Sequence, residues 1–140
     1  MDVDGCVWHE EVEFDEPTLL NFFMKNLEVL PNGTYRVFCQ GEECQLIAED
    51  VPYIIKKINV SPQSIELVFP GDYTEALDAS TLFVGPKNVL YCKVRAGKFT
   101  ARFNRTSYLD LTKEIRHDKK SNQFALTIDK KKYFIQGVKA

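Results

Sequence analysis

The sequence has no apolar run long enough to cross a bilayer, which needs about 18 or more consecutive apolar residues. It opens with MDVDGCVWHEEVEF, an acidic stretch without the basic flank and apolar centre of a signal peptide. Apolar residues make up 44% of the chain and charged residues 27%, which is typical of a globular protein. We therefore expect a cytoplasmic protein that has no membrane partner.

Cysteine and histidine are scarce, which argues against a disulfide framework and against a zinc centre. The two histidines, His9 and His117, are isolated, and we expect the cysteines to be reduced thiols. Cys39 and Cys44 flank a Gln-Gly-Glu-Glu turn, so a disulfide or a pair of metal ligands is geometrically possible there. No second close pair exists, and we expect neither a metal nor a cofactor. The four cysteines are Cys6, Cys39, Cys44 and Cys92.

Motifs of the common catalytic mechanisms are also missing. The chain has no glycine-rich phosphate loop, no nucleophile elbow with a serine between glycines and no paired-histidine helix motif. Nucleophilic catalysis, phosphoryl transfer and zinc-dependent hydrolysis therefore have no support in the sequence. Acid–base sites need no fixed spacing, so an acid–base enzyme that uses Glu49, Asp50 or His9 stays open as an alternative.

Charge is distributed unevenly, although the net charge is only −2. Residues 1–92 contain 16 acids and 5 Lys or Arg, whereas residues 93–140 contain 4 acids and 13 Lys or Arg. This asymmetry indicates either a basic end for an anionic partner or two complementary parts of one body. Nucleic-acid binding by the basic C-terminal part is a second alternative that we do not favour, because Tyr91 is the one aromatic expected on a basic face.

The first part of the chain predicts a helix followed by a hairpin. Asp15-Glu16-Pro17 places acids and a proline at a helix start, and apolar residues then recur at helical spacing. Pro31-Asn32-Gly33 is expected to end this helix. The strands TYRVFC and CQLIA are expected to form a hairpin around QGEE. The apolar positions of the helix are Leu19, Leu20, Phe23, Leu27 and Leu30.

The last part of the chain repeats this order of elements. Residues 107–116 predict a second helix with Ser107 as its cap, and NQFALTI and YFIQ predict a hairpin around DKKK. Between the two parts, IIKKINV and SIELVF are expected to pair, and STLFV and VLYCKV to add further strands. We predict two units that pack as one body. The first is a strand-helix-hairpin unit over residues 1–58. The second, over residues 59–140, consists of a connecting hairpin and the repeated strand-helix-hairpin.

The stretch VLYCKVRAGKFTARF allows the most specific prediction. If Ala96-Gly97 form a two-residue turn, Tyr91 pairs with Arg102 and Val94 pairs with Phe99. One face is then apolar and belongs to the core: Leu90, Cys92, Val94, Phe99, Ala101 and Phe103. The other face carries positive charge that must be solvated, bound to an anion or met by carboxylates. Its members are Tyr91, Lys93, Arg95, Lys98, Thr100 and Arg102.

Three stretches of the chain resemble a bacterial family known as domain-of-unknown-function family 1285. They are DGCVWHEE at 4–11, AEDVPY at 48–53 and YCKVRAGKFTARFNRTSYLDL at 91–111. The resemblance implies an α+β protein of two related units, each a helix packed on a curved antiparallel β-sheet, that form one compact body. It implies no established activity and favours a ligand-sensing or signalling role. The chain departs from the family's pattern at Val7, Cys39-Gln40 and Glu42-Glu43, so we expect a divergent member.

The acid pair Glu49-Asp50 ends an apolar strand just ahead of Pro52. Adjacent residues of an extended strand point to opposite faces, so the two carboxylates are not expected to converge on one substrate. We expect one of them to cap the turn and the other to neutralise Arg95 or Arg102.

The sequence therefore favours a non-enzymatic module that binds a small anionic ligand or a protein partner in the groove between the two units. Arg95, Arg102 and Tyr91 are expected to contact the anion, because the planar donors of arginine match carboxylate or phosphate oxygens. Trp8 and His9 are expected at the rim of this groove.

Overall fold

The computed structural model describes residues 1–9, 12–14, 16–39 and 41–137, and for Val7–His9, Val12–Phe14 and Cys39 it describes the backbone alone. Neither α-helix within these ranges is long and apolar enough to cross a membrane. In chain order the elements are β1 (Val7–His9), β2 (Val12–Phe14), α1 (Pro17–Asn26), β3 (Glu28–Val29), β4 (Tyr35–Cys39), β5 (Glu42–Leu46), β6 (Tyr53–Ile55), β7 (Lys57–Val60), β8 (Ile65–Val68), η1 (Pro70–Asp72), β9 (Thr74–Ala76), η2 (Ala79–Thr81), β10 (Phe83–Val84), η3 (Pro86–Asn88), β11 (Leu90–Val94), β12 (Phe99–Phe103), α2 (Arg105–Thr112), β13 (Ile115–Asp118), β14 (Gln123–Ile128) and β15 (Lys131–Phe134), where η marks a short 3₁₀ helix.

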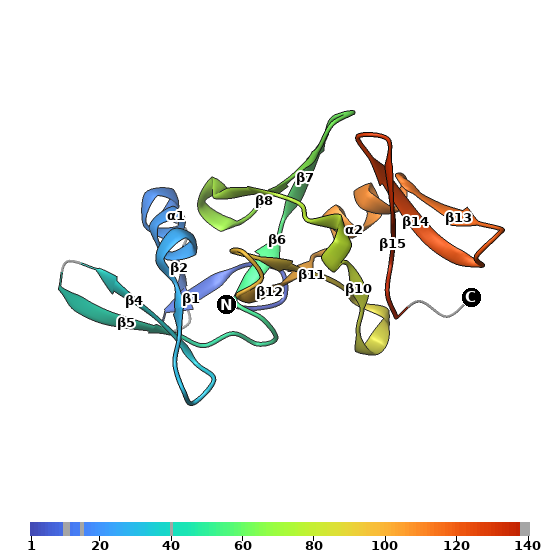
Figure 1. Cartoon of the computed structure of the whole chain (residues 1–140). Helices are drawn as coiled ribbons and strands as arrows, with labels where there is room; N and C mark the ends of the chain where they lie inside the picture. The colour runs from blue at the N-terminus through green and yellow to red at the C-terminus, as the bar shows by residue number, and fades with distance from the viewer. Residues whose placement is uncertain (10–11, 15, 40, 138–140) are drawn as a thin grey trace.

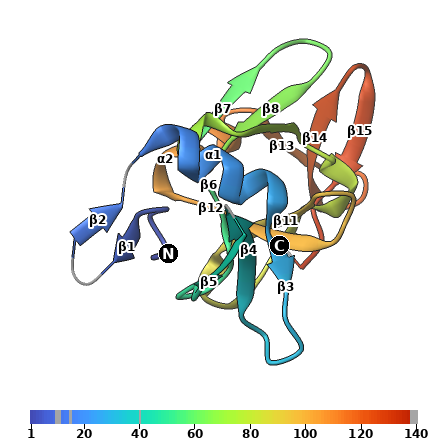
Figure 2. The same ribbon diagram turned by 90° about the vertical axis from the view of Figure 1, so that its left-hand side faces the viewer.

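The strands described form five small sheets, with a four-stranded sheet at the centre (Figure 1, Figure 2). This central sheet has the order β10-β11-β12-β6, and β6 runs parallel to β12. The other sheets are antiparallel: β1-β2, β3-β4-β5, β7-β8-β9 and β13-β14-β15. Figure 1 shows the β4–β5 hairpin and the β13–β15 sheet at opposite ends of the molecule. The predicted α+β class is confirmed, whereas the parallel pairing of β6 was not predicted.

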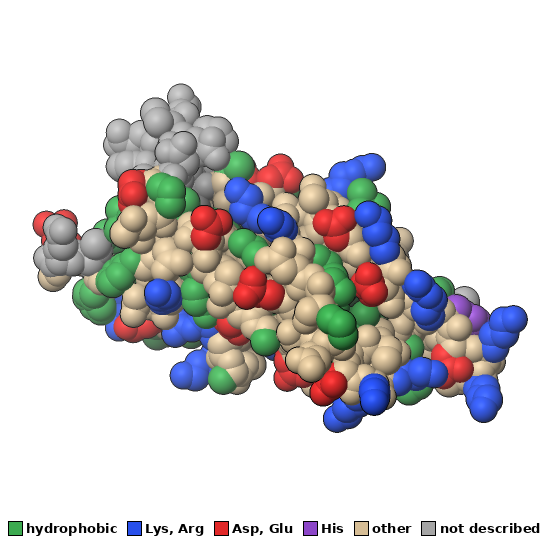
Figure 3. Space-filling view, turned by 90° about the horizontal axis from the view of Figure 1, so that it is seen from above, with side chains coloured by type: hydrophobic (Ala, Val, Ile, Leu, Met, Phe, Trp, Pro, Cys, Tyr) green, Lys and Arg blue, Asp and Glu red, His purple; other side chains and the backbone are tan. Residues whose placement is uncertain are grey.

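The end of the molecule formed by β13–β15 has a basic surface. Figure 3 shows Lys and Arg side chains gathered at this end. This basic surface includes the turn between β14 and β15. The ammonium group of Lys132, on β15, forms an ion pair of 3.5 Å with Asp118 of β13. Part of the excess of C-terminal positive charge therefore lies away from the β11–β12 hairpin.

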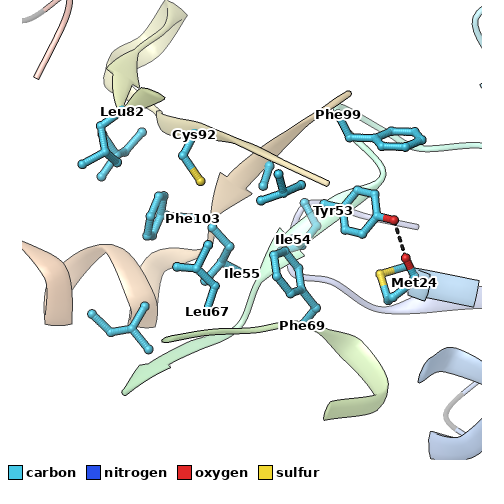
Figure 4. Close-up of a cluster of buried hydrophobic side chains, with 14 of the residues drawn as sticks. Met24, Tyr53, Ile54, Ile55, Leu67, Phe69, Leu82, Cys92, Phe99 and Phe103 are labelled. Atoms are coloured by element: carbon cyan, nitrogen blue, oxygen red, sulfur yellow. Dashed lines mark hydrogen bonds between the residues drawn. The ribbon is translucent and has the colours of Figure 1, made fainter. Parts of the chain in front are cut away.

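Strand β6 lies in the middle of the core. Its three residues, Tyr53–Ile55, are all 0% exposed, which is typical of a strand that is covered on both faces. Met24 of α1, Phe69 after β8 and Phe103 of β12 belong to the same cluster of buried side chains (Figure 4). The predicted strand IIKKINV is consequently divided: after Ile55 the chain leaves the central sheet, and β7 pairs with β8 as expected.

Helix α1 begins where the sequence predicts. Glu16 is the N-cap, its carboxylate accepts hydrogen bonds from backbone N–H groups two and three residues later, and Pro17 occupies the first turn. The helix ends at Asn26 and does not continue to Leu30. Leu27 adopts an extended conformation, because the residues that follow it pair with β4 as strand β3.

Helix α1 packs closely on the short helix η1. It buries Leu20 and Met24, and the side-chain amide of Asn21 donates a hydrogen bond of 3.0 Å to the carbonyl of Gly71. Gly71 has a φ of +75°, and a Cβ atom there would lie 2.3 Å from the backbone nitrogen of Asn21. A glycine is therefore required at this crossing, both by its conformation and by the lack of space.

Helix α2 starts two residues earlier than predicted, at Arg105. Its N-cap is Asn104, whose side-chain oxygen accepts a hydrogen bond of 2.9 Å from the backbone nitrogen of Ser107. Ser107, the predicted cap, is buried inside the helix and donates a hydrogen bond of 2.7 Å to the carbonyl of Ile55. The predicted end at residue 116 is also wrong, because residues 115–118 form β13 and pair with β14.

The predicted register of the β11–β12 hairpin is confirmed. The apolar face that the register defines is buried, from Leu90 at one end to Phe103 at the other. The observed pairs are Tyr91 with Arg102, Cys92 with Ala101, Lys93 with Thr100 and Val94 with Phe99.

The prediction that Arg95 shares a face with Arg102 is wrong. Residues 95–97 all have positive φ values of 52°, 57° and 82°, so the alternation of the strand stops before Arg95. The guanidinium group of Arg95 lies 5.2 Å from the centre of the Phe99 ring, on the apolar side of the hairpin. This reversal separates the two arginines that were expected to bind one anion.

The first hairpin has a shorter turn than predicted, with strands that end at Cys39 and resume at Glu42. Cys39 therefore pairs with Glu42, and Cys44 pairs with Val37, so the two cysteines are not directly opposite each other. The side chain of Cys39 lies outside the described residues, and Cys44 is a free thiol. Burial raises the pKa of the Cys92 thiol to about 12, which makes it unreactive at neutral pH.

Arg95 ties the central hairpin to the C-terminal turn of α1. Its Nη1 atom donates to the carbonyl of Leu27 at 2.8 Å and to the hydroxyl of Tyr53 at 3.1 Å. Tyr53 in turn donates to the carbonyl of Met24 (Figure 4). The carboxylate of Glu75 accepts from the backbone nitrogen of Arg95 at 2.9 Å. Carbonyl groups that a helix leaves unpaired at its C-terminus are thus satisfied, and a positive charge faces the negative end of the helix dipole.

Replacing Arg95 with alanine should lower the free energy of unfolding by about 2 kcal/mol, because the carbonyl of Leu27 loses its donor and α1 loses a favourable charge. Urea unfolding at constant pH measures this change. Lys98→Ala is the matched control, since Lys98 lies in the same turn, is exposed, and its side chain forms no hydrogen bond or ion pair with a described residue. The control should change stability by less than about 0.5 kcal/mol. Equal losses in the two variants would contradict the capping role of Arg95.

The tyrosines of this region should make the fold sensitive to alkali. Burial raises the pKa of Tyr53, and burial together with a 2.7 Å hydrogen bond to Glu75 raises the pKa of Tyr73, both above the ordinary 10.0. The unfolded chain therefore loses these protons first, so their contribution to stability is complete below pH 10 and is lost as the pH rises further. The tyrosinate absorbance of the native protein should rise at higher pH than that of the urea-unfolded protein, and Tyr73→Phe should reduce the difference. Identical titrations of native and unfolded protein would rule this out.

Candidate functional site

Glu49 and Asp50 lie between β5 and β6 and turn toward different neighbours. The Oε2 atom of Glu49 accepts a hydrogen bond of 3.3 Å from the backbone nitrogen of Val3. The Oδ2 atom of Asp50 accepts from the hydroxyl of Tyr91 at 2.7 Å and from Nη1 of Arg102 at 3.0 Å. The prediction that the two carboxylates diverge is confirmed, and so is the prediction that one of them neutralises Arg95 or Arg102, since Asp50 pairs with Arg102. The prediction that the other acid caps the turn is wrong, because Glu49 bonds to Val3 at the start of the chain.

Tyr91 is held in place on three sides. It is the cross-strand partner of Arg102, so both side chains leave the same face of the β11–β12 hairpin, where Asp50 meets them. Its ring stacks on Phe83 with 5.3 Å between the ring centres. Gly85 leaves room for the ring, because a Cβ atom there would lie 2.6 Å from Cε2 of Tyr91. Burial raises the pKa of Tyr91, and the hydrogen bond and negative charge of Asp50 raise it further.

Arg102 and Arg105 line one hollow of about 180 Å³ at the N-terminal end of α2. The side chain of Arg102 is 24% exposed and gives Nη1 to Asp50. Arg105 is exposed, and its guanidinium group has no hydrogen bond or ion pair with any residue that the structure describes. Within the described part of the chain, Asp50 is thus the one carboxylate that either arginine meets. The other lining residues are Asn88, Val89, Leu90, Phe103, Asn104 and Tyr108.

A larger hollow of about 420 Å³ adjoins the first one. The two hollows share Asn88, Leu90 and Tyr108. The remaining lining comes from β10, α2, β13, β14 and the residue after β15, and it contains no charged side chain. These residues are Val84, Thr112, Ile115, Phe124 and Ile135.

The structure brings only part of the predicted binding set together. Tyr91 and Arg102 are neighbours and share Asp50, whereas Arg95 lies on the opposite side of the hairpin. Trp8 and His9 belong to β1, and their side chains lie outside the part of the chain whose side chains are described. Their predicted place at the rim of a binding groove stays a prediction.

Sequence reasoning missed Arg105, because the helix was predicted to begin only at Ser107. The available signal was Asn104, which is a good N-cap and would have placed Arg105 at the first helical position. Arg105 and Tyr108 are then one helical turn apart on neighbouring surface of α2.

The described residues contain no group of three His, Cys, Asp or Glu side chains that could hold a metal ion. Glu49 and Asp50 engage different partners, so they do not form a convergent acid–base pair. The chemical property that the described site does provide is a surplus of positive charge beside an apolar surface.

No family model matches the chain, and no curated protein matches it in sequence. Solved structures that share its fold include a DUF1285 family protein from Silicibacter pomeroyi DSS-3, with a TM-score of 0.69 and 16% identity, over 96% of this chain and 75% of that one. A DUF1285 family protein from Shewanella baltica OS155 has a TM-score of 0.64 and 14% identity, over 82% of this chain and 90% of that one. The resemblance predicted from the sequence is confirmed at the level of the fold.

The ion pair between Asp50 and Arg102 should contribute measurably to stability. A double-mutant cycle with Asp50→Asn and Arg102→Gln is expected to give a coupling energy of about 1 kcal/mol, since the two side chains are only 30% and 24% exposed. Asp110→Asn with Lys113→Gln is the matched control. That pair is 43% and 74% exposed, so its coupling should be about 0.3 kcal/mol. Purely additive losses for Asp50 and Arg102 would show that the contact contributes nothing.

Proposed function

We propose that the chain, which has the DUF1285 fold, is a non-enzymatic module that binds a small anionic ligand in the hollow lined by Arg102 and Arg105. The observation that carries this proposal is that Arg102 and Arg105 both line one hollow and that the Arg105 side chain has no hydrogen bond or ion pair with a described residue. Like charges held close together repel each other unless an anion or solvent lies between them. Arginine also provides several planar donors that match carboxylate and phosphate oxygens.

Binding at this place would affect more than the two arginines. Arg102 is held by Asp50, and Asp50 lies in the segment that joins β5 to β6. An anion that attracts Arg102 therefore competes with Asp50 for the same guanidinium group. We propose that this competition links ligand binding to the position of the segment around Asp50, which would suit a sensing or signalling role.

The other functions considered from the sequence have less support. Acid–base catalysis by Glu49 and Asp50 lacks convergent carboxylates, and the side chain of His9 lies outside the described residues. Nucleic-acid binding would use the basic surface of β13–β15 (Figure 3), where the lysines at 130–132 are exposed at a turn. Lysines at such a turn are commonly solvated and serve solubility. A protein partner in place of the small ligand would bind at the same hollow, which is lined by Arg102 and Arg105.

We further propose that the chain consists of two related units, 1–58 and 59–140. In the first unit a hairpin (β1–β2) precedes α1 and the sheet β3-β4-β5, and in the second unit a hairpin (β11–β12) precedes α2 and the sheet β13-β14-β15. The same order of elements supports a common origin. Strand β6 of the first unit pairs with β12 of the second, so the units would share one core.

Titration with acetate and with inorganic phosphate at constant ionic strength tests the proposed function. Amide NMR signals of residues 88–90 and 102–108 should shift and saturate, and Arg105→Gln should weaken binding about tenfold, because it removes charge-assisted hydrogen bonds to the anion. Arg36→Gln is the matched control, since Arg36 lies on β4 and pairs with Glu28. It should leave binding unchanged. Equal affinity in Arg105→Gln, or shifts confined to β13–β15, would overturn the proposal.

A further inference from the structure

The arginine-lined hollow adjoins the larger apolar one. Asn88, Leu90 and Tyr108 line both, so they form the boundary between a cationic part and an apolar part. Tyr108 is 39% exposed, and its hydroxyl has no hydrogen-bond partner among the residues described. Tyr108 therefore adds a hydroxyl without a described partner to the residues that line the same hollow as Arg102 and Arg105.

The apolar hollow is suited to hydrocarbon and not to a polar group. Val84, Ile115 and Phe124 are only partly buried there, although they pack against the core. The hydroxyl of Thr112 already donates a hydrogen bond of 2.7 Å to the carbonyl of Leu109, so it does not require a partner from a ligand. Away from the boundary residues Asn88 and Tyr108, a polar ligand group placed among these side chains would lose its hydrogen bonds to water without replacement.

The size of the hollow fits part of a small molecule. Its volume of about 420 Å³ falls within the range of roughly 300 to 1,000 Å³ that is usual for ligand pockets. The arginine-lined hollow adds about 180 Å³ at one end only. Charged side chains therefore line only the smaller of the two adjoining hollows.

We propose that the ligand is an amphiphile with one aliphatic chain and one anionic group, the group bound by Arg102 and Arg105 and the chain lying in the apolar hollow. This inference rests on the proposed function, because it places the same anionic group at the same arginines. It adds the chemical class of the ligand. The charge complementarity at one end and the uncharged lining at the other end argue for a single molecule that spans both.

Burial of the ligand's aliphatic chain predicts how the binding affinity depends on chain length. Each methylene group that leaves water on binding should tighten binding about fourfold. In a series of straight-chain carboxylates the affinity should therefore rise steadily with length and stop rising when the hollow is full. The carboxylate itself, which every member of the series carries, should keep its dependence on Arg105.

Acetate, butanoate, hexanoate and octanoate, each below its micelle concentration, should be titrated into the protein and into three variants. In Arg105→Gln every member should bind about tenfold more weakly. Val84→Phe fills the apolar hollow and should reduce octanoate to the affinity of acetate while acetate is unaffected. Thr112→Leu is a second filling substitution, on α2, for the case that Val84→Phe disturbs the fold. Val29→Phe is the matched control, because Val29 is 61% exposed on β3 and lines neither hollow.

The possible results separate the two proposals. If acetate binds through Arg105 but longer chains bind no better, the amphiphile inference is wrong and the anion site stands. If octanoate binds but Arg105→Gln has no effect, the aliphatic chain of octanoate adsorbs to apolar surface of the protein and both proposals fail. If no member of the series binds and phosphate does not bind, both also fail. A length-dependent gain that Val84→Phe or Thr112→Leu abolishes and Val29→Phe preserves supports the amphiphile.

Discussion

The bond between the guanidinium group of Arg95 and the carbonyl of Leu27 is the contact on which the arrangement of the first helix depends. A helix of ten residues is too short to be stable alone, so it depends on its packing and on the hydrogen-bond partners of its ends. Here the C-terminal partners come from the central sheet, because Tyr53 of β6 and Arg95 after β11 reach the last turn together. The left-handed backbone at Arg95 makes this possible, since it sends a charged side chain to the apolar side of its hairpin.

The central hairpin is consequently held on both of its faces by residues that precede it in the chain. Arg95 and Phe99 face Tyr53 and the end of α1, whereas Tyr91 and Arg102 face Asp50 on the other side. The uneven distribution of charge along the sequence is explained to a small extent by these contacts, because Asp50 of the first part meets Arg102 of the second. The other basic residues of the hairpin and those on β13–β15 form no described ion pair with an acid of the first part, so complementarity accounts for Arg102 and not for the whole excess.

Local patterns in the sequence correctly predicted the features that depend on residues close together in the chain. The alternation and the turn of VLYCKVRAGKFTARF predicted the register of β11–β12, and Glu16-Pro17 predicted the start of α1. The failures involve partners that are distant in sequence. Ser107 has the chemistry of a cap, but its hydroxyl bonds to Ile55 in the core, and β6 pairs in parallel with a strand more than forty residues later. The site shows the same division: opposite charges predicted that Glu49 or Asp50 pairs with Arg95 or Arg102, and Asp50 pairs with Arg102. Arg105 and its hollow depend on where α2 begins.

The hydrogen-bond donors of Asp50 determine whether Arg102 can leave this carboxylate and bind an anion. Its Oδ2 atom accepts from both Tyr91 and Arg102, so the loss of one donor leaves the other in place. Both charged side chains are also partly exposed, which lowers the free-energy cost of separating them because water replaces the lost contact. A fully buried pair would resist separation, since each charge would be left without a partner in a medium of low polarity. A partly exposed carboxylate with a second donor is thus compatible with a ligand-dependent exchange at Arg102.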